Sequence, residues 1–191
     1  MLPERLEEDG LVLRRWVVGD AEALHAVIAE SASHLRPWVT WVEEEDISIE
    51  GRRVFIAECE REWQGGGSVL LGMFVGERIA GGCSLNVRAD AAGVLEIGYW
   101  LHPAFRGHGL ATRAARLLTE AALAVPDVRA VEIRHDKANA ASSAVPGGSA
   151  TRSLARLRAA RARAGRLRHR PGLAPDARAA EPGVAPVARP R

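Results

Sequence analysis

A strand, a glycine-rich turn and an amphipathic helix in direct succession place the strongest constraint on the fold of this chain. Residues 94–101 are rich in β-forming side chains, Pro103 ends that strand, and the turn at 106–112 follows. Pro126 ends the helix, and 129–134 is a further short strand. This order predicts a right-handed crossover with the turn at the C-terminal edge of the first strand. The apolar helix positions are Leu110, Ala114, Leu117, Leu118 and Ala121.

Two helices are expected before this unit. Asp20 is the predicted N-cap of the first helix, and Pro37 breaks the chain after it. Its apolar face is formed by Leu24, Val27 and Ile28. Ser48 is the predicted N-cap of the second helix, which the glycines at 65–67 end. Three apolar side chains recur in it at every fourth position, namely Phe55, Cys59 and Trp63.

The remaining strands form an antiparallel meander. They are expected at 11–16, 69–75 and 79–87. The two residues Gly76 and Glu77 suit a type II′ hairpin, and a loop at 88–93 leads to the strand at 94–101. A last helix is expected to begin at Asp136 or Asn139. The chain therefore reads as an α/β (α+β) protein with a mixed, mostly antiparallel sheet flanked by helices.

The turn Arg106-Gly107-His108-Gly109-Leu110-Ala111-Thr112 has the properties of an anion site. Glycines let the backbone approach a ligand, and the N–H groups and positive dipole end of a helix start bind a pyrophosphate. Arg106 adds charge at the edge of the turn. No Lys-Ser or Lys-Thr follows, which excludes a P-loop, and the dinucleotide fingerprint requires a glycine where Thr112 stands. On spacing alone, a plain tight turn is the alternative.

Composition excludes several other classes of site. Cys59 and Cys83 form no CxxC or Cys/His cluster, so neither a metal site nor a disulfide framework is expected. The first residues lack a basic segment followed by an apolar one, and no window approaches about 18 apolar residues. We therefore expect no signal peptide, no membrane span and a cytoplasmic location.

Residues 96–114, with the sequence EIGYWLHPAFRGHGLATRA, resemble the cofactor motif of the GNAT-type N-acetyltransferases. The resemblance is closest to the branch that contains the ribosomal-protein N-terminal acetyltransferases. The superfamily pattern (Arg or Gln, two residues, Gly, one residue, Gly or Ala) is met by Arg106, Gly109 and Ala111. Residues 139–142 resemble the next motif of the branch, in which an Asn and a Ser open a helix. Residues 34–41 resemble its Leu-Arg-Pro-Trp segment, so the likeness covers roughly 11–146.

This resemblance implies an acyl-CoA N-acyltransferase-like fold with acetyl-CoA as co-substrate. In the family, acetyl-CoA inserts where the fourth and fifth strands splay apart, and an amine attacks the thioester directly. Amides at 100–102 are expected to hold the acetyl carbonyl, and those at 107–112 the pyrophosphate. The acceptor is a protein N-terminus, an aminoacyl nucleotide or a small amine, and a homodimer is left open. The implied cofactor-binding residues are Trp100, Leu101, His102, Arg106, Gly107, His108, Gly109, Leu110, Ala111, Thr112 and Asn139.

Glu96 and Ser142 are the implied catalytic residues. Glu96 is expected to act as the base, directly or through a water, with a raised pKa. Exposure to solvent or pairing with an arginine is equally open, because strand alternation does not tell which face it takes. Ser142 or Asn139 is expected to contact the pantetheine arm or thiol, with helix capping as the competing role. Many members place a Tyr acid in this last helix, but here its position falls near Pro146, so the thiolate is expected to leave unassisted.

Four further side chains have a functional and a structural interpretation. Trp38 and Trp41 are expected to line the acceptor pocket, with packing in the core as the alternative. His102 and His108 flank the glycine turn. Either is in a place to touch phosphate, although a histidine in a loop is more often simply exposed.

The composition changes sharply after residue 146. The segment 147–191 contains eleven arginines against Asp176 and Glu181, whereas all nine aromatic residues lie at or before Phe105. Members of the family continue with a Leu-Gly-Phe-like segment and a hairpin, which this sequence lacks. We therefore expect an acetyltransferase domain at 1–146 without its last two strands. A basic tail at 147–191 would follow, partly helical and mostly disordered.

Three explanations of this tail stay open. The favoured one is a reading-frame shift near codon 146 of a GC-rich gene. It would leave the strand at 129–134 as an exposed edge and the protein an acyl-CoA binder with impaired catalysis. The second is a basic tail that binds nucleic acid or ribosomal RNA through its phosphates. The third is an intact but shortened fold.

Overall fold

The computed structural model describes residues 2–88, 90–136 and 139–148. Their strands form one sheet in the order β1-β2-β3-β4-β5-β6. The pairs are antiparallel up to β4–β5, and β5–β6 is parallel. This confirms the expected mixed, mostly antiparallel sheet. The strands are β1 (Arg5–Glu8), β2 (Leu11–Arg15), β3 (Val69–Val75), β4 (Arg78–Val87), β5 (Val94–Leu101) and β6 (Ala130–Ile133).

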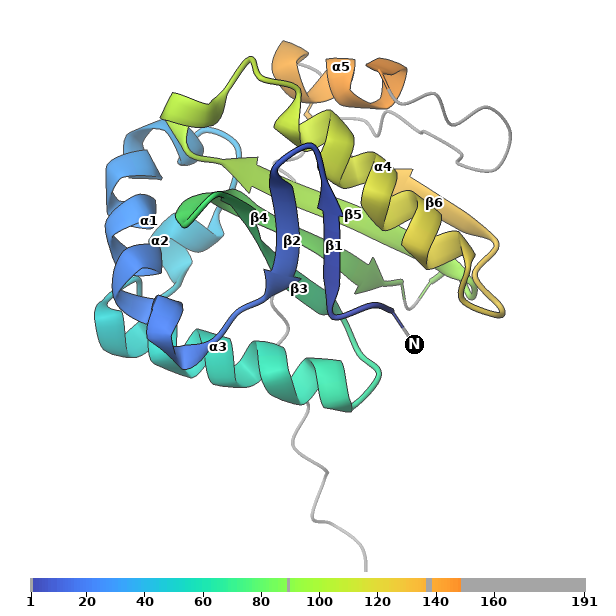
Figure 1. Cartoon of the computed structure of the whole chain (residues 1–191), viewed down its shortest axis with the longest axis horizontal. Coiled ribbons are helices and arrows are strands. Elements are labelled where there is room, and N and C mark those ends of the chain that lie inside the picture. Colours follow the sequence, from blue (N-terminus) through green and yellow to red (C-terminus); the bar gives the residue numbers. More distant parts are fainter. Residues whose placement is uncertain (1, 89, 137–138, 149–191) are drawn as a thin grey trace, which may run out of the picture.

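Helices cover both faces of the sheet (Figure 1). The α-helices are α1 (Ala21–Leu35), α2 (Trp41–Glu44), α3 (Ile49–Gln64), α4 (Leu110–Leu123) and α5 (Ala140–Gly148). Short 3-10 helices occur at Val18–Asp20 and Pro103–Phe105. The crossover helix α4 lies on one face, and α1 and α3 lie on the other. Among the described residues, no helix is long and apolar enough to span a membrane.

Two buried clusters fix which face each residue of β5 takes. Ile97 is 1% exposed and packs with Leu118 of α4 and Val131 of β6. Trp100 packs in the other cluster, with residues of α1 and α3 such as Leu24 and Ile56. Since side chains alternate along a strand, Tyr99 and Leu101 point to the α4 face, and Glu96 shares the opposite face with Trp100.

Most expected elements are present, and their ends are set by the residues that predicted them. Ser48 Oγ accepts a hydrogen bond from the Gly51 N–H at 3.1 Å, which confirms the cap of α3. Gly76 has φ +59° in the two-residue β3–β4 connection, as the first position of a type II′ turn requires. Asn139, rather than Asp136, precedes α5, because its Oδ1 accepts the Ser142 N–H at 3.0 Å.

Three features differ from the sequence-based expectation. Strand β1 has only one large apolar residue, Leu6, and was not predicted; it forms a hairpin with β2 at the edge of the sheet. The four-residue helix α2 was also missed, since it is too short for a helical pattern. Asp20 does not cap α1 with its side chain. Its carboxylate accepts two hydrogen bonds from Arg14, both at 2.8 Å, and one from the Val17 N–H.

Within the described part of the chain, β6 is the edge strand beyond β5. The expected basic tail lies almost wholly outside the described residues, which end at Gly148. The three explanations of that tail therefore stay predictions.

Candidate active site

Strand β5 is longer than its parallel neighbour β6. Its parallel pairing with β6 ends at Ile97 opposite Ile133, whereas its antiparallel pairing with β4 continues to Leu101 opposite Gly81. The last four residues of β5, Gly98–Leu101, thus have no strand on the β6 side among the described residues. We call Gly98–Leu101 the free end of β5. Strands β5 and β6 are the fourth and fifth strands expected from the sequence. Their numbers are higher by one because β1, which was not predicted, comes first.

The backbone amides near the free end of β5 face alternately towards β4 and towards the unpaired side. The His102 N–H donates to the Ala80 carbonyl of the neighbouring strand β4 at 2.9 Å. Backbone groups along a strand face its two neighbours alternately, so the Trp100 amide also faces β4, and those of Tyr99 and Leu101 face the free side. The expectation that amides at 100–102 hold the acetyl carbonyl stays a prediction. The His102 amide is engaged with Ala80, whereas the Leu101 amide has no protein partner among the described residues.

The glycine turn leads from this free end into α4. Gly107 and Gly109 have φ +78° and +71°, a conformation that glycine adopts without strain. Gly109 is the N-cap of α4 and has no side chain to bond the first amides of the helix. In the described structure, no backbone N–H between Gly107 and Thr112 donates a hydrogen bond. Unpaired donors at a helix start are what an anionic ligand requires, so the turn fits a pyrophosphate.

The side chains around the turn divide into free and engaged groups. Arg106 is exposed, and within the described ranges its guanidinium has no ion-pair partner. Burial, and then the nearby Arg106, lower the pKa of His34, so that ring is uncharged at neutral pH. His102 Nε2 lies 3.0 Å from Glu30, and its Nδ1 accepts the Ala104 N–H. The His102 ring therefore caps the 3-10 helix at Pro103–Phe105, whereas His108 is exposed.

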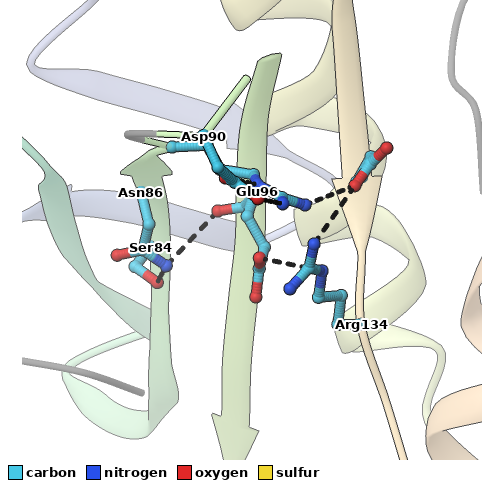
Figure 2. Close-up of polar contacts among 7 residues, drawn as sticks. Ser84, Asn86, Asp90, Glu96 and Arg134 are labelled. Carbon is cyan, nitrogen blue, oxygen red and sulfur yellow. Dashed lines mark hydrogen bonds and ion pairs between the residues drawn. The ribbon is translucent and has the colours of Figure 1, made fainter. Parts of the chain in front are cut away.

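Glu96 lies in a polar network on the α1 face of the sheet, across from β6 (Figure 2). Its carboxylate is 3.3 Å from Arg134 Nε, and its side chain is 26% exposed. Burial raises the pKa of Glu96; the Arg88 guanidinium opposes that shift, and Glu132 and Asp90 add to it. A partly exposed carboxylate with a raised pKa is suited to accept a proton. The pairing with an arginine that the sequence left open is present as well.

Arg88, the first residue of the 88–93 loop, binds the acidic side chains near Glu96. Its guanidinium donates to Glu132 of β6 at 2.7 Å and also bonds Asp90. These contacts raise the pKa of Arg88 and lower that of Asp90, so both stay charged. Because Arg88 satisfies Glu132, Arg134 lies closer to Glu96 than to Glu132, at 3.3 Å against 3.9 Å.

Two polar side chains of β4 were missed by the sequence analysis. Asn86 Nδ2 donates to Ser84 Oγ at 3.0 Å and to the Glu96 carbonyl at 3.3 Å, and Ser84 is 2% exposed (Figure 2). Ser84 pairs in register with Gly98, the first residue of the free end. Polar residues two apart in an otherwise apolar strand are the signal that could have identified them.

Asn139 and Ser142 take different roles at the start of α5. Asn139 is the capping residue, as its contact with the Ser142 N–H shows. Ser142 Oγ instead lies 2.7 Å from the Tyr99 hydroxyl, which also donates to the Ser142 carbonyl at 3.2 Å. Tyr99 belongs to the free end of β5 and was not among the predicted site residues. The site therefore contains a tyrosine hydroxyl, although not one from the last helix.

Comparison with known proteins agrees with this arrangement. Residues 10–147 match the acetyltransferase (GNAT) domain. The chain belongs to the GNAT acetyltransferase family. It is also 28% identical over 127 residues to "Putative ribosomal N-acetyltransferase YdaF" of Bacillus subtilis (strain 168), covering 66% of this chain and 69% of that protein. The resemblance to ribosomal-protein acetyltransferases is thus confirmed, and so is the enzyme class at the level of the family.

Solved structures of other GNAT acetyltransferases share the fold of this one. RimL, described as a ribosomal L7/L12 alpha-N-protein acetyltransferase in complex with coenzyme A, has a TM-score of 0.67 and 25% identity. That match covers 75% of this chain and 79% of RimL. MccE, the Microcin C7 self immunity acetyltransferase with acetyl-CoA and AMP, has a TM-score of 0.55 and 25% identity. This chain spans 62% of the length of MccE, and 59% of this chain is covered.

Trp38 and Trp41 of this GNAT domain lie in the buried cluster on the α1 face of the sheet. Trp41 is 7% exposed, and its ring centroid is 5.9 Å from that of Trp100. Trp41 therefore packs in the core, which was the alternative to its expected place in the acceptor pocket. Trp38 is only partly buried, and its expected place in the acceptor pocket stays a prediction. No group of three or more metal-ligating side chains occurs among the described residues.

Proposed function

We propose that this chain transfers the acetyl group of acetyl-CoA to an amine by direct attack on the thioester. The observation that carries the proposal is the row of unpaired amides at Gly107–Thr112, directly after the free end of β5. A pyrophosphate on the helix start would leave the pantetheine arm to run along the unpaired strand edge. The relatives solved with coenzyme A or acetyl-CoA support this choice of ligand.

Each part of the site then has one task. The amides of the turn and the Arg106 guanidinium bind the pyrophosphate. The Leu101 amide donates to the acetyl carbonyl oxygen, where negative charge develops during attack. Glu96 accepts the amine proton, directly or through one water, and its raised pKa suits that transfer near neutral pH.

The acceptor amine is expected on the α1 face of the sheet. Glu96 and Trp100 lie on that face, and Trp38 lies close by among the residues packed with Trp100. A protein N-terminus is the acceptor class that we propose first, because YdaF and RimL carry names of that kind. Small amines are the second class to test.

Two measurements test the proposal. Calorimetry compares acetyl-CoA with acetylpantetheine, which keeps the thioester and lacks the pyrophosphate. The expected result is clearly tighter binding of acetyl-CoA, and equal binding would remove the turn from the site. Release of free thiol is then measured with peptides of different N-terminal residues and with small amines. Binding without any amine-dependent thiol release would indicate an acyl-CoA-binding protein with impaired catalysis.

A further inference from the structure

We propose that Arg88 is a positioning residue of the site: it binds Glu132 and thereby leaves Arg134 to hold the Glu96 carboxylate. This inference rests on the proposed acetyl transfer, in which Glu96 accepts the amine proton. Arg88 bonds the carboxylates of Glu132 and Asp90, so its effect on the reaction passes through Glu96.

The Arg88 side chain links two strands that are not neighbours in the sheet. Arg88 directly follows β4, Glu132 belongs to β6, and β5 lies between these strands. Asn86 pairs in register with Glu96, and Glu96 with Glu132, so their side chains form a row on one face of the sheet. Arg88 lies two residues after Asn86 and on the same face, and its Nη1 donates to Glu132 at 2.7 Å. The contact therefore crosses β5 beside Glu96.

The ion pair between Arg88 and Glu132 is well shielded from solvent. Their side chains are 12% and 15% exposed, whereas that of Arg134 is 40% exposed. Solvent screens exposed charges more than buried ones, so Arg88 is the stronger of the two cations that reach Glu132. Its Nε also donates to Asp90 at 2.9 Å, which fixes the guanidinium from a second side.

Arg134 has two carboxylates within reach. Its Nε is 3.3 Å from Glu96, and its Nη2 is 3.9 Å from Glu132 (Figure 2). While Arg88 binds Glu132, the nearer partner of Arg134 is Glu96. Without Arg88, Glu132 would keep its charge and compete with Glu96 for the Arg134 guanidinium. Arg88 therefore determines how Arg134 is shared between the two carboxylates.

The charges around Glu96 act in the same direction. Burial raises the pKa of Glu96, Arg88 lowers it, and Glu132 and Asp90 raise it. The facing polar side chains of β4 are uncharged, and α1 and α3 add no ion pair to Glu96 within the described part of the chain. Loss of Arg88 would remove a cation and leave the charge of Glu132 uncompensated. Both changes raise the pKa of Glu96 further, so Glu96 would stay protonated to a higher pH.

Arg88→Met tests the proposal, because it removes the charge and keeps an unbranched side chain. We expect the acid limb of kcat/KM for amine-dependent thiol release, measured with one acceptor peptide, to move to higher pH by about 0.5–1 unit. This is less than the effect of a close, buried charge, since Glu96 is partly exposed. A carbon-13 NMR titration of the Glu96 carboxyl, assigned by its absence in Glu96→Gln, should move by the same amount. The KM for acetyl-CoA should stay within about twofold.

Glu132→Gln and the double variant separate positioning from a merely structural role. Glu132→Gln removes the competing carboxylate, so both titrations should move to lower pH. Arg88→Met/Glu132→Gln removes one charge of each sign, and both titrations should return most of the way to the wild type. A structural role predicts no such return, because the double variant has lost both partners of the ion pair.

Arg116→Met is the matched control. Arg116 also binds two carboxylates from different elements, Glu8 of β1 and Glu120 of α4, and α4 covers the other face of the sheet. The variant loses the same charge far from Glu96. It should lose stability to urea and keep the pH profile of the wild type.

An Arg88→Met variant in which either titration is unshifted would overturn the proposal, and so would a double variant displaced as far as Arg88→Met. If Arg88→Met does not fold, the isosteric Glu132→Gln decides by the direction of its shift. A wild-type protein without amine-dependent thiol release would instead contradict the proposed function. The NMR titrations would then decide by themselves whether Arg88 controls Glu96.

Discussion

Replacing Gly109 by alanine tests whether the backbone of the turn binds the pyrophosphate. Gly109 has φ +71°, and nothing lies within 4 Å of the place its Cβ would take, so the change causes no clash. A left-handed backbone costs an L-residue roughly 1–2 kcal/mol. The lower entropy of the unfolded alanine chain offsets about 0.4–1 kcal/mol of this. We expect the free energy of unfolding to fall by about 1 kcal/mol, or about 2–4 °C in Tm.

The effect on the ligand should be larger than the effect on the fold. An alanine that relaxes out of the left-handed region rotates the amides on both sides of residue 109. Each hydrogen bond to a charged group contributes about 1.5–3 kcal/mol. The loss of one such bond would raise the Kd for acetyl-CoA roughly tenfold to hundredfold. Calorimetry measures this Kd, and urea unfolding of the same preparation measures the stability.

Gly66 offers a matched control at the other side of the molecule. It has φ +70°, an equally open Cβ position, and follows α3 rather than preceding α4. Gly66→Ala should lose about the same stability as Gly109→Ala, because the backbone conformations are alike. Its Kd for acetyl-CoA should equal that of the wild type. If the two variants bind acetyl-CoA equally well, the reasoning about the turn is refuted.

Further changes test the base and the cap. Glu96→Gln should lower kcat at least about hundredfold with little change in the Kd for acetyl-CoA, and unchanged turnover in the thiol assay would remove Glu96 as the base. Because the folded state raises the pKa of Glu96, kcat/KM should rise with pH through a value above the usual carboxyl range of about 4.3. The same shift gives stability that is fully present below about pH 4.3 and is lost as the pH rises through the folded pKa. The difference in Tm between Glu96→Gln and the wild type should therefore grow in favour of the variant over this pH range. Ser48→Ala should cost about 1 kcal/mol in urea unfolding through loss of the α3 cap, with acetyl-CoA affinity unchanged, and no loss would contradict the capping role.

Local sequence signals predicted the elements that build the site. The strand at 94–101 and the helix beginning at Leu110 were placed by alternation, by Pro103 and by helical spacing. Those signals are strong because the residues face a buried layer on one side. Strand β1 lacks that pattern, since it is short and at the edge, and its formation depends on pairing with β2.

Contacts between distant segments could not be predicted from the sequence. Asp20 looked like a helix cap, but Arg14 on the neighbouring strand binds its carboxylate. The face taken by Glu96 follows from the packing of Ile97, which alternation alone does not reveal. The contact between Tyr99 and Ser142 depends on the whole crossover between β5 and α5. Such contacts depend on how the whole chain folds, so a local sequence pattern does not reveal them.

The free end of β5 couples ligand binding to the stability of the fold. Its outward amides have no protein partner among the described residues, so they should exchange with solvent hydrogen faster than those facing β4. A bound pantetheine arm would close this edge and slow the exchange of the Tyr99 and Leu101 amides. At a ligand concentration about a hundred times Kd, binding adds about 2.7 kcal/mol to stability. The protein is therefore expected to resist unfolding and edge-to-edge aggregation best when acetyl-CoA is abundant.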